Sequence, residues 1–292
     1  FMIVVNFKST NENHDYKHHR LSALNSLGAI YRKAGLYEDS KKFLDQAIDI
    51  DPKDPFTHID LALLYELMND DESALKSYIN AENLTLNPDL EYINSNELKR
   101  FQHVLYNNIA LIKNDQKKYE EAISWLDKGI AIDPEFFSYY LNRYTNNTNL
   151  NRTDEANEDL KIALELSPYN PSALFNRGNL RYKKGDYIGA LSDYTTAIEI
   201  KEKSNYFYER GVLLLEKFND FEGAIKDFKQ AVNLEDDIIN LIYNNLNDSN
   251  HSNYKIYLCL GIVLSGKKDL DSCKFLNKAK QYIDVNNTDR IT

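Results

Sequence analysis

The sequence has few cysteines, prolines and glycines and no long apolar run. Its 292 residues include only 2 cysteines, which are too few for a disulfide framework or a thiolate zinc site. No segment approaches the roughly 18 consecutive apolar residues that a membrane-spanning helix needs. Positive charge is also in deficit, since the formal net charge is −10. A chain with this charge would be repelled by a phosphate backbone. These shortages argue against a disulfide scaffold, a membrane helix and general nucleic-acid binding, and we expect a cytoplasmic location.

Motifs of enzyme active sites are missing as well. The chain contains no glycine-rich phosphate loop and no H-E-x-x-H, C-x-x-C or G-x-S-x-G pattern. Cys259 and Cys273 are each expected to be small buried apolar residues. The histidines at 14, 18 and 19 lie in a polar segment without supporting ligands, which makes a poor metal site. We therefore expect no enzymatic activity, no cofactor and no metal centre.

The chain does contain an internal repeat. Ala122, Ala156 and Ala190 are 34 residues apart, and Pro134 and Pro168 have the same spacing. Small residues, large aromatic or aliphatic residues and prolines recur around them in one fixed order. The pattern resembles that of the tetratricopeptide repeat family, W-x₂-L-G-x₂-Y, then A-x₃-F, then P. The resemblance implies an all-α, right-handed superhelical solenoid of about seven helix-turn-helix repeats.

The resemblance also sets the expected boundaries. We expect a flexible arm over residues 1–20, a solenoid over 21–286 and a tail over 287–292. The repeats are expected near residues 21–54, 55–88, 103–136, 137–170, 171–204, 204–238 and 254–286. Glycines between the paired helices, Gly35 and Gly185, suit a left-handed turn conformation.

Two insertions interrupt the repeats. Residues 89–102 include Ser95, a possible helix cap, followed by an apolar stripe, so the next first helix should be about two turns longer than usual. Residues 239–253 contain another apolar stripe and then a polar segment, which predicts a helix or helix extension followed by a loop.

The fourth repeat departs from the family pattern. Tyr144 stands where a small residue is expected, and Asn147 stands where a large aromatic residue is usual. Because asparagine and threonine have modest helix propensity, the first helix of this repeat should be the least stable. Ordinary drift within a degenerate repeat would explain the same residues.

Three asparagines share one position in consecutive repeats: Asn108, Asn142 and Asn176. In the tetratricopeptide family this position lines the concave groove, and the arrangement is similar to the asparagine ladder of the O-GlcNAc transferase. An amide offers donors and an acceptor that can bind the backbone of an extended peptide. In a chain so rich in asparagine, coincidence would explain the match equally well. Further residues expected on this face are Asn107, Leu111, Leu141, Thr145, Phe175, Asn179, Tyr182, Tyr208, Glu209 and Val212.

The leading functional interpretation is a non-enzymatic scaffold that binds a protein or extended peptide in the groove. The acidic residues Asp115, Glu209 and Glu216 would favour a neutral or basic ligand. The basic clamp with which some family members bind acidic chaperone tails is absent. One alternative is the sensory or targeting portion of a larger enzyme or peptide-responsive regulator.

A second alternative is a structural protein that self-associates. After Ile283 the sequence is too short and polar to form a capping helix, although a terminal repeat normally needs one. The face bearing Leu270, Leu276 and Tyr282 would then stay partly bare. We expect weak homo-association through this C-terminal end.

Overall fold

The computed structural model describes residues 14–85, 95–234, 253–267 and 272–279, and every regular element in these ranges is an α-helix. The chain divides into two compact units, one up to Ile162 and one from Ala163. The first unit contains α2 (His14–Lys33), α3 (Tyr37–Ile50), α4 (Pro55–Leu67), α5 (Asp71–Thr85), α6 (Ser95–Asp115), α7 (Tyr119–Ile132), α8 (Phe137–Asn149) and most of α9 (Thr153–Leu166). The second contains α10 (Pro171–Lys183), α11 (Tyr187–Ile200), α12 (Ser204–Lys217), α13 (Phe221–Leu234), α15 (Asn253–Lys267) and a helix over residues 272–279.

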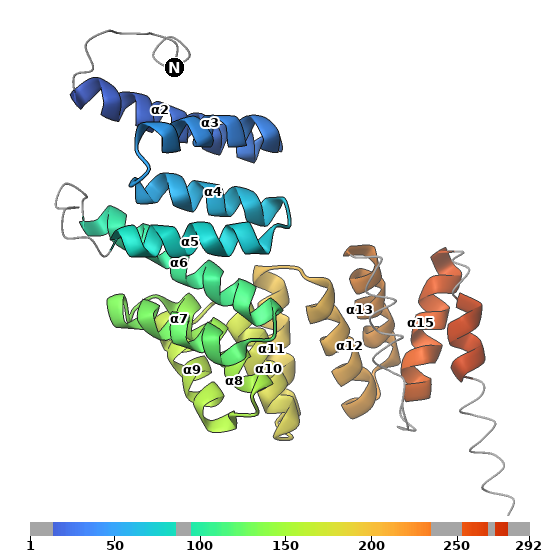
Figure 1. Ribbon diagram of the computed structural model, residues 1–292. Helices are drawn as coiled ribbons and strands as arrows, with labels where there is room; N and C mark the ends of the chain where they lie inside the picture. Colours follow the sequence, from blue (N-terminus) through green and yellow to red (C-terminus); the bar gives the residue numbers. More distant parts are fainter. Residues whose placement is uncertain (1–13, 86–94, 235–252, 268–271, 280–292) are drawn as a thin grey trace, which may run out of the picture. The chain divides into compact units, whose positions relative to one another are not determined.

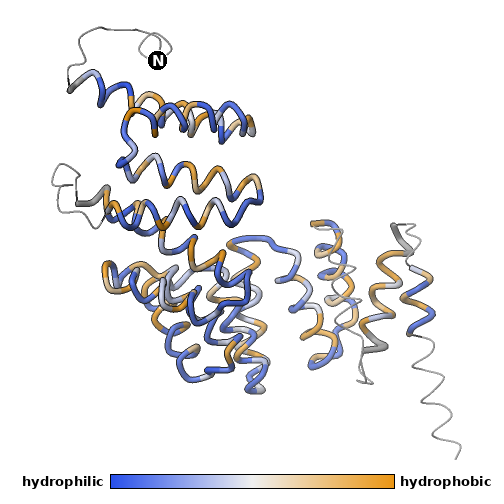
Figure 2. Tube along the Cα trace, viewed as in Figure 1, coloured by the Kyte–Doolittle hydropathy of each residue, from blue (hydrophilic) through white to orange (hydrophobic). Residues whose placement is uncertain are grey.

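Within each unit the helices form antiparallel hairpins (Figure 1). Each expected repeat from residue 21 to residue 234 corresponds to one hairpin, such as α4 with α5 or α10 with α11. Apolar residues recur along every described hairpin (Figure 2). A single hairpin cannot bury such a face alone, so neighbouring hairpins must cover one another. The expected all-α fold of helix-turn-helix repeats is confirmed.

The first helix begins earlier than the sequence suggested. Residues 14–20, assigned above to a flexible arm, form the first turns of α2. Leu21 and Leu24 are buried against Ala47, whereas Lys17, His18 and His19 in the turns before them are exposed to solvent. Residues 1–13 of the expected arm lie outside the described residues.

The lengthened helix after the first insertion is confirmed. Helix α6 begins at Ser95 and has 21 residues, against 13 or 14 for α4, α8, α10 and α12. Its added turns pack on the preceding repeat, since the ring centroids of Phe101 and Phe56 are 4.1 Å apart. The stripe expected in the second insertion falls on residues 235–252, outside the described residues.

Small residues on the first helix of a repeat face large residues on the second. A Cβ atom added at Gly178 would lie 2.6 Å from the ring of Tyr194, and one added at Gly28 would lie 2.6 Å from Leu44. Gly211 approaches the Phe228 ring in the same way. At these three positions the close approach of the two helices requires a glycine.

The turns inside the hairpins use one backbone conformation. Gly35 and Gly185 have φ values of 76° and 82°, as their predicted left-handed conformation requires. Three asparagines, Asn69, Asn151 and Asn219, occupy the same turn position with φ between 53° and 59°. Lys117 also occupies it, with φ 60°. A side chain in this conformation costs roughly 1–2 kcal/mol, and asparagine tolerates it better than lysine.

Replacing Lys117 with glycine should therefore stabilise the protein. We expect a gain of about 0.5–1 kcal/mol, because relief of the strained φ outweighs the greater flexibility of glycine in the unfolded chain. Chemical denaturation followed by circular dichroism measures the change. The neighbouring Lys118 has φ −92°, so Lys118→Gly should give no gain. A Lys117→Gly protein less stable than the parent would contradict this account of the turn.

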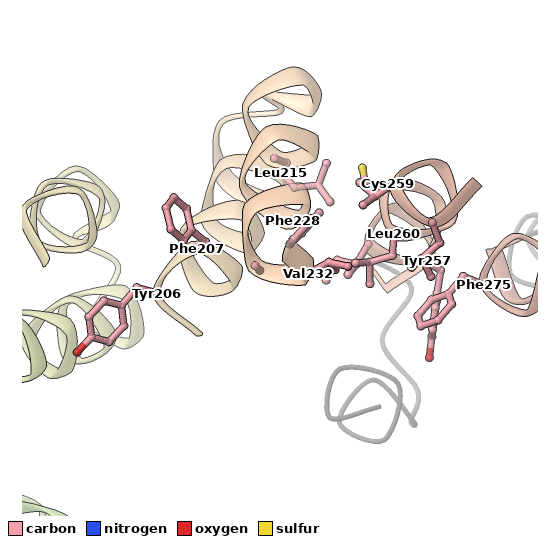
Figure 3. Packing of buried hydrophobic residues seen from close by; sticks show 14 of the residues in the cluster. Tyr206, Phe207, Leu215, Phe228, Val232, Tyr257, Cys259, Leu260 and Phe275 are labelled. Carbon is pink, nitrogen blue, oxygen red and sulfur yellow. The ribbon is translucent and has the colours of Figure 1, made fainter. Parts of the chain in front are cut away.

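The last described hairpin completes a continuous cluster in the second unit (Figure 3). Phe228, Tyr257 and Phe275 have no exposed surface, and Cys259 is buried among them. The expectation of a buried cysteine is thus confirmed for Cys259 but wrong for Cys273, which is exposed. In the helix over residues 272–279, the buried stripe consists of Ser272, Phe275 and Ala279, so the adjacent position 273 faces outward.

Candidate functional site

The predicted site residues lie on the first helices of four hairpins. We call this surface the first-helix face, and each unit has its own part of it. In the first unit, α6 carries Asn107, Asn108 and Leu111, and α8 carries Leu141, Asn142 and Thr145. In the second unit, α10 carries Phe175, Asn176, Asn179 and Tyr182, and α12 carries Tyr208, Glu209 and Val212. Leu111 and Thr145 are exposed, and the other members are half-buried.

In the first unit the asparagine amides are bonded within the chain. The Asn108 amide nitrogen donates to the Tyr78 hydroxyl at 2.8 Å and lies 3.4 Å from Glu66 Oε2. The Asn142 amide nitrogen donates to Asn107 Oδ1 at 2.6 Å. These donors are engaged because acceptors from neighbouring first and second helices lie within reach. At Asn108 a ligand would have to use the amide oxygen or displace these bonds, whereas the Asn142 nitrogen uses only one of its two N–H groups.

Glu66 and Tyr78 form the polar centre of this part of the face. The Tyr78 hydroxyl donates to Glu66 Oε1 at 3.1 Å. Burial raises the pKa of the Glu66 carboxyl, and the hydrogen bond from Tyr78 partly opposes that shift. Arg32 lies on α2 of the preceding hairpin and Asp60 on α4 with Glu66, and Arg32 Nη2 is 3.1 Å from Asp60 Oδ1. The face of the first unit therefore carries two groups of polar side chains with internal bonds, Glu66 with Tyr78 and Asn108, and Arg32 with Asp60.

In the second unit the corresponding amides are less occupied. Among the residues the structure describes, none forms a hydrogen bond with the half-buried Asn176 amide. Asn179 Oδ1 accepts a bond from the Tyr194 hydroxyl at 2.7 Å, and no bond from its amide nitrogen to another described residue is found. Asn176 and Asn179 are three residues apart on α10 and hence on one side of the helix. The second unit therefore offers free amide groups to a ligand.

The aromatic residues on this part of the face are partly committed to packing. The Phe175 ring stacks on Tyr206 with centroids 4.5 Å apart and lies 5.6 Å from Tyr194. Tyr208 packs against the buried Phe228 ring at 5.9 Å. Both half-buried rings thus hold neighbouring helices together and present only part of their surface to a ligand.

Two carboxylates accompany these rings on α12. The Tyr182 hydroxyl donates to Glu216 Oε2 at 2.6 Å, and Lys217 Nζ lies 3.8 Å from the same oxygen. Glu209 receives no hydrogen bond from any described residue. Burial raises the pKa of the Glu209 carboxyl, the charge of Glu216 raises it further, and Lys183 partly opposes the shift. Glu209 is therefore a half-buried carboxylate without a direct neutralising partner in the described chain.

A row of ion pairs lies beside this face and was missed in the sequence reasoning. Arg143, Arg177 and Arg210, at one position of successive first helices, each bind an aspartate on the second helix of the same hairpin. The pairs are Arg143 with Asp159, Arg177 with Asp193 and Arg210 with Asp227, at 2.6 to 2.8 Å. Each aspartate side chain is only 4% exposed. The 34-residue spacing of the aspartates was the available signal, as clear as that of the alanines.

Asp159 also explains one departure of the fourth repeat from the family pattern. Asn147, which is 4% exposed, donates to Asp159 Oδ2 at 3.0 Å. In the next repeat the equivalent residue, Arg181, donates to Asp193 at 2.9 Å. Asn147 replaces a large aromatic residue because the neighbouring second helix presents a carboxylate there. The predicted low stability of α8 stays a prediction.

The C-terminal face proposed for self-association lies mostly outside the described residues, which exclude Leu270 and Tyr282. Leu276 is half-buried and packs against Gly261, where an added Cβ would lie 2.6 Å from its side chain. Homo-association through this end stays a prediction. None of the described helices combines the length and apolarity needed to cross a membrane.

Comparisons with known proteins agree with this architecture. Family models described as tetratricopeptide repeat match residues 21–54, 103–136 and 149–206. The chain is 24% identical to human protein O-mannosyl-transferase TMTC1 over 73% of its length, but it covers only 22% of that protein. It is 22% identical to stress-induced-phosphoprotein 1 of Caenorhabditis elegans, with 51% of this chain and 57% of that protein covered. The chain thus spans between about a fifth and just over half of these relatives.

A solved structure supports the fold. PilF of Pseudomonas aeruginosa matches with a TM-score of 0.62 at 22% identity, over 80% of this chain and 99% of that chain. At this identity the similarity concerns the fold alone. Together with the repeated hairpins and their interlocking small and large residues, the family-model matches identify the chain as a tetratricopeptide repeat protein.

Proposed function

We propose that the protein is a non-enzymatic scaffold whose first-helix face binds a protein or an extended peptide. The observation that carries the proposal is the set of half-buried amides at one repeat position, with unoccupied groups at Asn176 and Asn179. Amide groups can bind the backbone of an extended chain, and partly exposed rings beside them can contact its side chains. The tetratricopeptide repeat fold is typical of protein-interaction scaffolds, which supports the same class of function.

Changing Asn108, Asn142 and Asn176 together to alanine should weaken peptide binding by about 10- to 1000-fold. Each lost amide contact contributes about 0.5–1.5 kcal/mol, and 1.4 kcal/mol corresponds to a factor of ten. The probe is a set of 12-residue peptides selected from a random phage-displayed library on the parent protein. Fluorescence polarisation then compares their affinities for the parent and the variant.

A matched variant tests whether removing any three asparagines weakens binding, or only removing those on the first-helix face. Asn80, Asn83 and Asn233 are exposed on the second helices α5 and α13, and their triple change to alanine should leave affinity unchanged. Because Asn108 and Asn142 also bond within the chain, the melting temperature of each variant is recorded, and binding is measured well below it. If the variant that lacks Asn108, Asn142 and Asn176 bound the peptides as tightly as the parent, these amides would not belong to the binding site. Failure of the library to yield any binding peptide would refute the proposed function.

A second candidate is that these repeats are the targeting or sensory part of a longer protein. The chain covers only a small part of the length of its O-mannosyl-transferase relatives, and this observation favours the second candidate. Sequencing the complete messenger RNA tests this directly. An additional catalytic domain in the same reading frame would support it, and a transcript encoding the repeats alone would refute it.

A further inference from the structure

The first-helix face of the second unit carries a carboxylate that costs stability. Glu209 is half-buried and receives no hydrogen bond from the described residues. Seven residues later on the same helix, Glu216 is 18% exposed and lies near enough for its charge to act on Glu209. Burying a charge that lacks a partner is unfavourable. A neutral residue of the same shape would therefore stabilise the unbound protein.

The positive charges nearby are directed elsewhere. Lys217 lies 3.8 Å from Glu216 and over the rings of Tyr182 and Tyr187, at 5.5 and 5.1 Å from their centroids. Lys183 is exposed, and no ion pair joins it to Glu209 among the described residues. The charge on Glu209 therefore remains available to a cation from outside the chain.

Two tyrosines lie beside the two carboxylates: Tyr208 precedes Glu209 on α12, and the Tyr182 hydroxyl of α10 donates to Glu216 Oε2 at 2.6 Å. The charge of Glu209 contributes to the raised pKa values of Tyr182, Tyr194 and Tyr208, although burial is the larger cause in each. All three hydroxyls therefore remain protonated at neutral pH. Aromatic rings beside a carboxylate favour a guanidinium, which is planar, stacks on rings and donates two parallel hydrogen bonds.

We infer that the face formed by Glu209, Glu216, Tyr182 and Tyr208 binds an arginine side chain of the peptide ligand. The inference rests on the proposed function and specifies the chemistry of the partner. Charge complementarity favours this occupant, because the chain has a net charge of −10 and Glu209 lacks a cation of its own. The Asn176 amide and the Asn179 amide nitrogen lie on the neighbouring first helix, where they can hold the peptide backbone.

The stability of Glu209→Gln gives the first test. This change keeps the shape and removes the charge, so the melting temperature at pH 7 should rise by about 2–4 °C. The matched control is Glu199→Gln, an equal charge change at an exposed position of α11, which should leave the melting temperature within about 1 °C. A lower melting temperature for Glu209→Gln would mean that the carboxylate has a structural role and would overturn the inference.

Binding gives the second test, with synthetic pools of nine-residue peptides that have random flanks and one fixed central residue. The centre is arginine in one pool and citrulline, its neutral analogue, in the other. The immobilised parent protein should retain the arginine pool at least about 10-fold more than the citrulline pool. This preference should disappear in Glu209→Gln and persist in Glu199→Gln.

The outcomes separate this inference from the proposed function. Equal retention of both pools by the parent, above that of beads without protein, would refute the arginine site and leave peptide binding standing. A preference that survives in Glu209→Gln would also refute it. Retention of neither pool would count against both proposals.

Discussion

Asp193→Ala should lower the free energy of unfolding by about 2–4 kcal/mol, because it removes a buried acceptor from two arginines. Arg177 Nη2 lies 2.7 Å from Asp193 Oδ1, and Arg181 Nη1 lies 2.9 Å from Oδ2. Both guanidinium groups are about one third exposed, so water offsets part of the loss. Urea denaturation followed by circular dichroism measures the change.

The sequence itself contains an apolar version of this pair, which provides the control. In the first hairpin the positions of Arg177 and Asp193 hold Leu27 and Phe43. The double change Arg177→Leu with Asp193→Phe should therefore restore stability to within about 1 kcal/mol of the parent, as replacing a buried ion pair with packed apolar residues often does. Arg181 keeps Asp186 as a neighbour at 3.6 Å. If the double variant were as unstable as Asp193→Ala, the two kinds of pair would not be interchangeable.

Phe228→Ala should lower the free energy of unfolding by about 3–5 kcal/mol, the usual cost of removing a buried phenylalanine ring. Phe228 is fully buried in the cluster of the second unit (Figure 3). Gly211 faces it, and an added Cβ there would lie 2.8 Å from the ring. The glycine cannot fill the space that the ring would leave, so a cavity would remain.

Leucine at position 228 should be tolerated far better, at a cost of about 1 kcal/mol. Leu44 already faces Gly28 in the first hairpin, and Leu276 faces Gly261 in the last described one. Thermal unfolding of the alanine and leucine variants measures the difference. Equal losses in both would show that the ring has a role beyond filling space.

Trp125 is the single tryptophan of the chain and lies in the first unit, so its fluorescence reports separately on that unit.

The features predictable from the sequence were those that repeat. The hairpins, the left-handed turns at Gly35 and Gly185 and the longer α6 all follow from spacing or from local residue preferences. Features that depend on a specific neighbour were not predictable. The Asn108 donor is engaged because Tyr78 and Glu66 lie beside it, and Asn147 is buried because Asp159 accepts its bond. Cys273 is exposed because its helix turns Phe275 inward, a rotation that hydrophobicity alone did not determine.

The row of arginine–aspartate pairs also disfavours pairing of their helices with helices of uncharged repeats. An array of similar hairpins is exposed to a particular error during folding, in which a first helix docks against the second helix of another repeat. If α10 docked against α7, Arg177 would meet Trp125 in place of Asp193 and would lose its buried partner. If α6 docked against α11, Ile109 would cover the carboxylate of Asp193 and leave it without a donor. The three charged hairpins thus differ in pairing chemistry from the first and third hairpins, which hold Leu27 with Phe43 and Ile109 with Trp125 at these positions. Mispairing between the two kinds would leave a charge without its partner and is disfavoured.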